Sequence, residues 1–281
     1  MANRNREAEM SFWDHLEDLR WTLFRCIIAL SVFTVGGFLC MRFIFNEIIM
    51  WPAEPDFILY QGLDKLSRIM PIFPDFFSQT INIDIVNIKL ATQFLTHLTT
   101  SFWVALLLTF PYLMYEVWKF VSPALYEHEK KNVRWVFFFG TFMFFIGCAV
   151  GYFLVFPMAF RFLGGYQLSE SIRQQVSLES YMDNFLTLLF VMGIVFEMPL
   201  VSWLLSQLGL LKRSFFNKYR RHAIVGLLVV AAVITPTGDP FTLSVVFFPL
   251  YGLYELSAFF VKKAPKENED ESADVVKYGA E

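Results

Sequence analysis

Charged residues are scarce in this sequence. Only 17% of its 281 residues are Asp, Glu, Lys or Arg, whereas 56% are apolar and 34 are phenylalanine. Soluble domains average about 25% charged residues, so this balance excludes an ordinary soluble domain and indicates a membrane protein. The net charge of −3 adds nothing, because topology depends on where Lys and Arg lie and not on their sum.

Motifs for catalysis and cofactor binding are also missing. The sequence has no HExxH, no GxSxG and no phosphate-binding glycine loop, and His15 lacks a second histidine at helical spacing. Its three cysteines (Cys26, Cys40 and Cys148) lie in apolar runs without metal-ligand spacing or a disulfide framework. These absences predict no enzyme activity, no metal and no cofactor.

The basic clusters flank apolar runs, where topology explains them, so nucleic-acid binding is not predicted either. No cleavable signal sequence is recognised, because an acidic segment precedes the first apolar run.

Apolar runs predict an all-α integral membrane protein with six transmembrane helices in one membrane domain, residues 1–262. The runs are 26–41, 90–117, 135–160, 185–211, 223–234 and 241–254. The last two helices are short, about 18 and 21 Å by helical rise, against roughly 30 Å of hydrocarbon. Either the bilayer thins beside them or protein covers their ends. Residues 263–281 are charged and patternless, which predicts a disordered cytoplasmic tail.

The polar segments between the runs set the orientation. Of 23 Lys and Arg residues, 17 fall on the side of the N-terminal arm, the 119–134 loop, the 212–221 loop and the tail. The positive-inside rule therefore places both termini in the cytoplasm.

A helix at about 11–24 is predicted to precede the first span, and the proline-rich segment 43–90 is predicted to cap the bundle on the far side, with a short helix at 59–70. Arg25 and Arg42 are expected to snorkel at the ends of the first span.

One ionisable residue, Glu197, lies near the middle of the fourth apolar run. A carboxylate at that depth costs on the order of 2.5–3.5 kcal/mol unless it meets protein, water or a partner. Pro199 removes a backbone donor two residues later, so a bend is predicted beside the acid. The acid is either hydrogen-bonded inside the bundle or part of a docking or passage site.

Carboxylates also concentrate on the predicted cytoplasmic side. Asp18 lies before the first span with other acids of the N-terminal helix, and Glu129 lies in the 119–134 loop. Two separated carboxylates suit two guanidinium groups, each of which binds a carboxylate in a bidentate fork. The alternatives are a solvated acidic face and, for the whole protein, a secondary carrier of a small solute or ion built around midplane acids.

Four segments resemble the TatC family, the multispanning receptor subunit of the twin-arginine protein translocase. They are HLEDLR at 15–20, FPYLMYEVWKFVSPALYEHEKK at 110–131, GIVFEMPL at 193–200, and the TPTGDP turn with PLYGLYE at 249–255. The resemblance covers residues 11–262. It implies a multi-pass protein of the prokaryotic cytoplasmic membrane that binds twin-arginine signal peptides of folded cargo. It also implies an oligomeric complex with TatA/TatB-type single-span partners in membrane lipid, driven by the transmembrane proton gradient.

The resemblance assigns signal-peptide binding to Glu129, Asp18, His15, Phe120 and Pro123. Asp18 stands where the family usually carries Glu, which shortens the side chain by one carbon. Alternatives remain open for each residue: surface pairing with a neighbouring cation for Glu129, an electrostatic effect on its own helix for Asp18, and ordinary packing for Phe120 and Pro123.

Intramembrane partner contacts are assigned by the resemblance to Glu197, Thr235 and Asp239, and a structural role in the far-side cap to Pro52. The sequence departs from the family in the TPTGDP turn, which is one residue longer than the usual proline-proline-aspartate turn. It also has Leu243 where glutamine is common.

Overall fold

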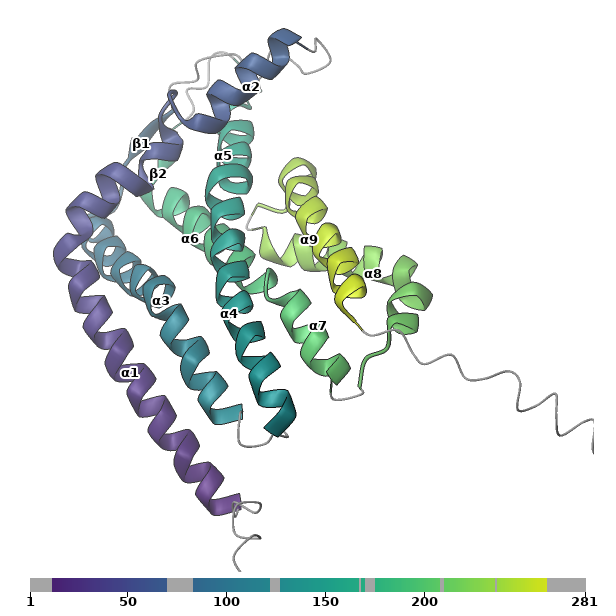
Figure 1. The fold of residues 1–281 in the computed structure, drawn as a ribbon. Helices are drawn as coiled ribbons and strands as arrows, with labels where there is room; N and C mark the ends of the chain where they lie inside the picture. Colours follow the sequence, from purple (N-terminus) through teal and green to yellow (C-terminus); the bar gives the residue numbers. More distant parts are fainter. Residues whose placement is uncertain are drawn as a thin grey trace, which may run out of the picture.

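The computed structural model describes residues 12–69, 83–121, 127–166, 168–169, 175–207, 210–235 and 237–261, and these form a bundle of helices (Figure 1). Helix α1 (Phe12–Phe43) runs antiparallel to α3 (Thr92–Val121), and α4 (Glu127–Val150) leads through η5 (Gly151–Val155) into α5 (Phe156–Gly165). The remaining elements are η1 (Ile44–Ile49), η2 (Trp51–Ala53), α2 (Ile58–Ile69), β1 (Asp84–Val86), β2 (Gln175–Ser177), α6 (Leu178–Val195), α7 (Met198–Gln207), α8 (Arg213–Ile234) and α9 (Pro240–Phe260).

Five stretches of the described chain are long and apolar enough to cross a membrane: Leu16–Leu63, Thr92–Phe120, Phe137–Gly165, Leu178–Gln207 and Pro240–Phe260. The sixth predicted run belongs to α8, which begins at Arg213 with basic turns that the hydropathy pattern left out. The last helix also continues to Phe260, beyond the predicted end at 254. At 22 and 21 residues, α8 and α9 are about 33 and 32 Å long and exceed the predicted lengths. They are still shorter than α1 and α3, which have 32 and 30 residues.

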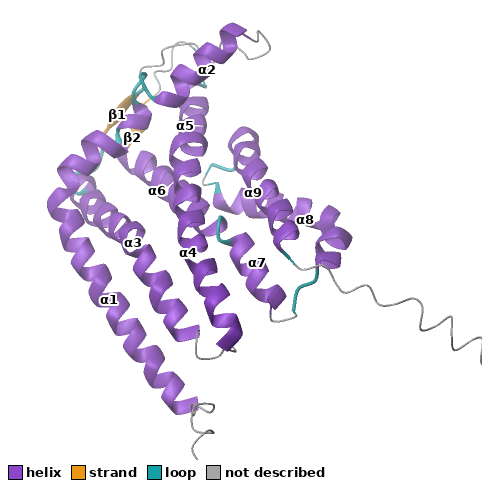
Figure 2. Cartoon of the chain, viewed as in Figure 1, coloured by secondary structure: helices purple, strands orange, loops and turns teal. Residues whose placement is uncertain are grey.

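A two-stranded parallel sheet departs from the all-α prediction. Strands β1 and β2 pair Asp84 with Gln175 and Val86 with Ser177, and Figure 2 shows them as the strand segments of the described chain. Each strand has three residues, too few for an alternating pattern to be visible in the sequence. The pair joins the segment before α3 to the segment before α6, which are both loops of the predicted far side.

Three tyrosines hold the turn that contains Pro52. Pro52 is buried in η2, and its carbonyl oxygen accepts a hydrogen bond of 2.8 Å from Tyr60 of α2. Tyr152 and Tyr181 donate to the carbonyl oxygens of Ile48 and Ile49, at 2.7 and 2.6 Å. A π-helical turn followed by a proline leaves carbonyl groups without helical partners, and these hydroxyls satisfy them. The predicted helix at 59–70 is confirmed as α2.

Close packing of α4 against α6 depends on glycine. A Cβ atom added at Gly147 would lie 2.5 Å from the carbonyl oxygen of Met192 and 2.7 Å from Cβ of Phe196. Gly193, on the other helix, similarly faces Phe144 and Cys148, with 2.7 Å to each. Small residues of this kind let helix backbones approach closely in membranes, where packing replaces the hydrophobic effect as the driving force.

Gly147→Ala is therefore expected to lower the free energy of unfolding by about 1–3 kcal/mol, because the obstructing atom belongs to the backbone and cannot move aside. Thermal unfolding of the purified protein in detergent measures this loss. Gly36→Ala is the control, since a Cβ at Gly36 meets no atom within 4 Å. Alanine favours the helix at that position, so no loss is expected. Equal unfolding midpoints for the two variants would contradict the packing account.

Candidate functional site

One end of the bundle brings together the segments that carry the predicted peptide-binding residues. The first turns of α1, the last turns of α3 and the start of α4 lie at this end (Figure 1). Asp18 lies on α1 with its side chain exposed, and Phe120 lies half-buried in the last turn of α3. His15 lies on α1 and Glu129 in the first turn of α4, but their side chains are not among the described ones, and Pro123 lies outside the described residues.

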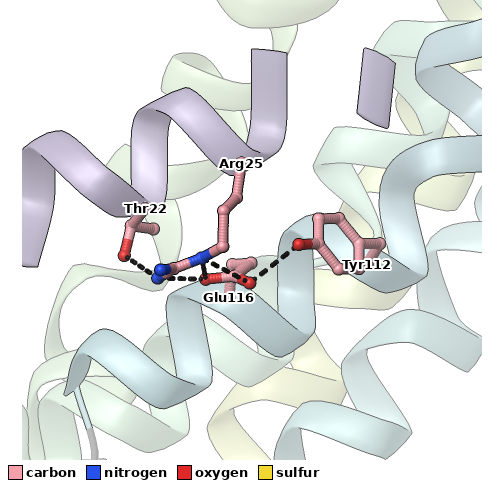
Figure 3. A network of polar contacts seen from close by, with 4 residues as sticks. All are labelled: Thr22, Arg25, Tyr112 and Glu116. Carbon is pink, nitrogen blue, oxygen red and sulfur yellow. Dashed lines mark hydrogen bonds and ion pairs between the residues drawn. The ribbon is translucent and has the colours of Figure 1, made fainter. Parts of the chain in front are cut away.

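A polar network joins α1 to α3 a few turns inside this end (Figure 3). Arg25 Nε donates to both carboxylate oxygens of Glu116 at 3.0 Å, and Arg25 Nη2 lies 2.9 Å from Glu116 Oε2. The Tyr112 hydroxyl donates to Glu116 Oε1 at 2.9 Å, and Arg25 Nη2 donates to Thr22 Oγ1 at 3.1 Å. The sequence predicted that Arg25 snorkels at the end of the span, and the structure adds that its guanidinium is bound to a buried acid of another helix.

Sequence reasoning assigned no role to Glu116, although a signal was present. The residue stands in the largely apolar run FPYLMYEVW, and an ionisable residue inside such a run indicates a polar partner or a function. Arg25 stands in a similar position at the start of the first apolar run. The two residues are 91 positions apart, so their pairing becomes evident only when α1 and α3 are placed side by side.

Glu197 lies at a break between α6 and α7. Phe196 and Glu197 form a turn between the two helices, which confirms the bend predicted beside Pro199. Pro199 cannot donate to the carbonyl of Val195, so the helical ladder is interrupted there. The bend turns the carboxylate toward α4, where a Cβ at Gly140 would lie 2.9 Å from Glu197 Oε2.

Both carboxylate oxygens of Glu197 are buried and have no hydrogen-bond partner within the described part of the chain. The sequence left two interpretations of Glu197 open. The described part of the chain does not support the first of them, a hydrogen bond inside the bundle. A buried polar group without a partner is costly and calls for an explanation. An incoming group with a hydrogen-bond donor would supply what the isolated chain lacks.

Thr235 and Asp239 lie in the turn between α8 and α9. Thr235 is buried, and its hydroxyl donates to the carbonyl of Ala231 at 3.0 Å. Asp239 is the N-cap of α9 and accepts hydrogen bonds from Thr242 N at 2.8 Å and from Thr237 Oγ1 at 2.7 Å. Burial opposes its ionised form, but these hydrogen bonds outweigh burial and hold the pKa of Asp239 below its ordinary value. Both polar groups thus have local structural partners.

A glycine in the TPTGDP turn has a clear conformational role. Gly238 has φ of +59°, in the left-handed region that side chains with a Cβ rarely adopt. This glycine lets the chain reverse direction before Asp239 caps α9. The longer turn therefore retains the capping aspartate in spite of its departure from the family pattern.

No group of three or more His, Cys, Asp or Glu side chains that could hold a metal ion occurs within the described ranges. The cysteines Cys26, Cys40 and Cys148 are free thiols. The candidate site residues instead provide carboxylates at two places, one at the end of the α1–α3 pair and one at the α6–α7 break.

Comparison with known proteins gives consistent results. The family "Sec-independent protein translocase protein (TatC)" matches residues 14–249. The Sec-independent protein translocase protein TatC of Blattabacterium sp. subsp. Periplaneta americana is 35% identical over 264 residues, which cover 92% of this chain and 99% of that protein. TatC of Escherichia coli K12 is 32% identical over 246 residues, covering 88% and 86%.

Solved structures show the same likeness. A crystal structure of the twin arginine translocase receptor TatC in DDM superimposes with a TM-score of 0.70 at 27% identity, covering 88% of this chain and 99% of that chain. A second crystal structure of the twin arginine translocase receptor TatC gives a TM-score of 0.66 at 26% identity and covers 88% and 97%.

Proposed function

We propose that this chain, which belongs to the TatC family of Sec-independent protein translocase proteins, is the receptor for twin-arginine signal peptides. The chain is a multi-pass protein of the bacterial inner membrane and a component of a protein translocase, not an enzyme. Its family favours protein translocation over the secondary carrier that composition alone left open.

In this proposal Glu129 and Asp18 bind the paired arginines. His15, Phe120 and Pro123 shape the surface around them. The observation that carries it is that the first turns of α1 and α4, which contain Asp18 and Glu129, lie at the same end of the bundle as the last turns of α3, in a chain similar to a twin arginine translocase receptor. A carboxylate accepts two parallel hydrogen bonds from a guanidinium, and two acids on separate helices suit two adjacent arginines. The positive-inside count supports a cytoplasmic location for this end and for both termini.

In this proposal Glu197 recruits single-span partners of the TatA/TatB type, together with the turn that contains Thr235 and Asp239. The unpartnered oxygens of Glu197 support this role, because a donor on a partner's membrane helix would satisfy them. Thr235 and Asp239 shape the turn in this proposal, since their polar groups already have partners within the chain. The assembled complex then exports folded cargo with the transmembrane proton gradient as its source of energy.

Export in cells tests the proposed function. A host that lacks its own TatC gene receives this chain together with the single-span partners encoded in the same genome. A folded reporter with a twin-arginine signal is expected to reach the far side of the membrane, and the same reporter with two lysines is expected to remain in the cytoplasm. Failure of export, with the chain and its partners present in the membrane, would contradict the receptor assignment. Genes for small single-span proteins next to the gene for this chain would also argue against the hypothesis that it is a carrier.

A further inference from the structure

The α1–α3 network lies on the same two helix faces as the predicted recognition residues. Asp18, Thr22 and Arg25 are spaced by four and three residues and so share one face of α1. On α3, Tyr112, Glu116 and Phe120 are each four residues apart and share a face in the same way. Because α1 and α3 are antiparallel, Asp18 and Phe120 both lie toward the same end, one or two turns beyond the Arg25–Glu116 pair. By helical rise, Asp18 is about 10 Å from Arg25 along α1.

Glu116 itself is closed to an incoming ligand. Its side chain is 3% exposed, and its two oxygens already receive the hydrogen bonds from Arg25 and Tyr112. Arg25 differs, because its side chain is 39% exposed. Glu116 is therefore buried, whereas Arg25 is partly open to the surroundings. If Glu116 were lost, the guanidinium of Arg25 would be unpaired and would face the surroundings of Asp18.

Charged side chains of both signs lie around the network. The described acids nearby are Glu17, Asp18 and Glu116, and the described cations are Arg20, Arg25 and Lys119. Arg20 already forms an exposed salt bridge with Glu17 at 3.5 Å. Removal of Glu116 would add one net positive charge to this end of the helix pair, at the place where a peptide with two arginines is expected to bind.

We propose that Glu116 is a positioning residue of the recognition site, a role that rests on the proposed function. It holds the guanidinium of Arg25 against α3 and cancels its charge. Asp18 therefore stays available to a guanidinium from outside the chain. Without Glu116, Arg25 repels the peptide and competes with it for Asp18.

Peptide affinity of charge variants tests the proposal, with the full-length protein in nanodiscs and a labelled twin-arginine peptide. Glu116→Gln is expected to weaken binding roughly tenfold, the effect of one unpaired charge on a dication about 10 Å away in a partly aqueous setting. The loss should shrink to about twofold in 1 M salt, because exposed charges are then screened. The double variant Arg25→Gln/Glu116→Gln removes both charges and should bind within about threefold of wild type.

Glu179→Gln is the matched control. Glu179 forms a salt bridge of 2.6 Å with Lys89, which likewise joins segments far apart in the sequence, but it lies near the start of α3, the opposite end from the site. This variant should bind the peptide as wild type does. A merely structural Arg25–Glu116 pair would give a different pattern, since the double variant would then bind as poorly as Glu116→Gln and both would unfold at lower temperature.

Two results would overturn the proposal: wild-type affinity in Glu116→Gln, or a double variant that is not rescued. If wild type binds the peptide and Glu129→Ala weakens binding while Glu116→Gln does not, this inference alone fails. If wild type does not distinguish the peptide from its lysine counterpart, the proposed function fails and this inference fails with it.

Discussion

Replacement of Glu129 by alanine is expected to weaken the binding of a twin-arginine signal peptide by about 2–5 kcal/mol, a loss of at least about thirtyfold in affinity. The physical reason is that a guanidinium brought to this end of the bundle would lose its charge-assisted acceptor and remain incompletely paired. A titration of the labelled peptide against wild type and variant in nanodiscs measures the difference.

Glu127→Ala is the control for Glu129→Ala. Glu127 lies in the same first turn of α4 but two residues earlier, and residues two apart on a helix do not share a face. Both variants remove one negative charge from the same segment. Equal losses would mean that only net charge matters, and an unchanged affinity in Glu129→Ala would remove this residue from the recognition site.

Replacement of Glu197 by alanine is expected to abolish the recruitment of single-span partners and to leave peptide binding within about twofold of wild type. The carboxylate has no hydrogen-bond partner within the described chain, so a partner's donor is its proposed counterpart. For the same reason the isolated chain should not lose stability. Removal of an unsatisfied buried polar group relieves a cost of about 1–3 kcal/mol, so Glu197→Ala should unfold at the same or a higher temperature.

This combination, lost recruitment with retained stability, separates docking from structure. Site-specific crosslinking to the partner helix reports recruitment, and thermal unfolding in detergent reports stability. Glu197→Gln keeps the size and hydrogen-bonding capacity of the side chain and should retain part of the crosslinking. Unchanged crosslinking in Glu197→Ala, or a clear drop in its unfolding midpoint, would favour a purely structural glutamate.

Local chemistry explains which parts of the fold could be predicted from the sequence. Pro199 removes a donor wherever its helix packs, so the break beside Glu197 follows from the residue itself. The turn before α9 likewise follows from glycine and a capping aspartate. The predicted start of α8 was wrong because hydropathy recognises apolar residues, whereas Lys and Arg are also good helix formers.

Contacts between distant segments could not be predicted in this way. Helical spacing indicates which residues share a face, but it does not say which helix that face meets. The Arg25–Glu116 pair and the β1–β2 pairing both depend on that missing information. The hydrogen bonds from Tyr152 and Tyr181 to backbone carbonyl groups could not be predicted either, because donor and acceptor lie more than 100 residues apart in the chain.

The central claim is that this chain recognises two adjacent arginines, and one titration tests it most directly. Wild-type protein in nanodiscs is titrated with a twin-arginine signal peptide and, separately, with the same peptide carrying two lysines. Saturable binding of the arginine peptide, with the lysine peptide at least about tenfold weaker, is the predicted result, because an ammonium cannot form the bidentate contact. Equal binding of the two peptides, or no binding of either, would contradict the account.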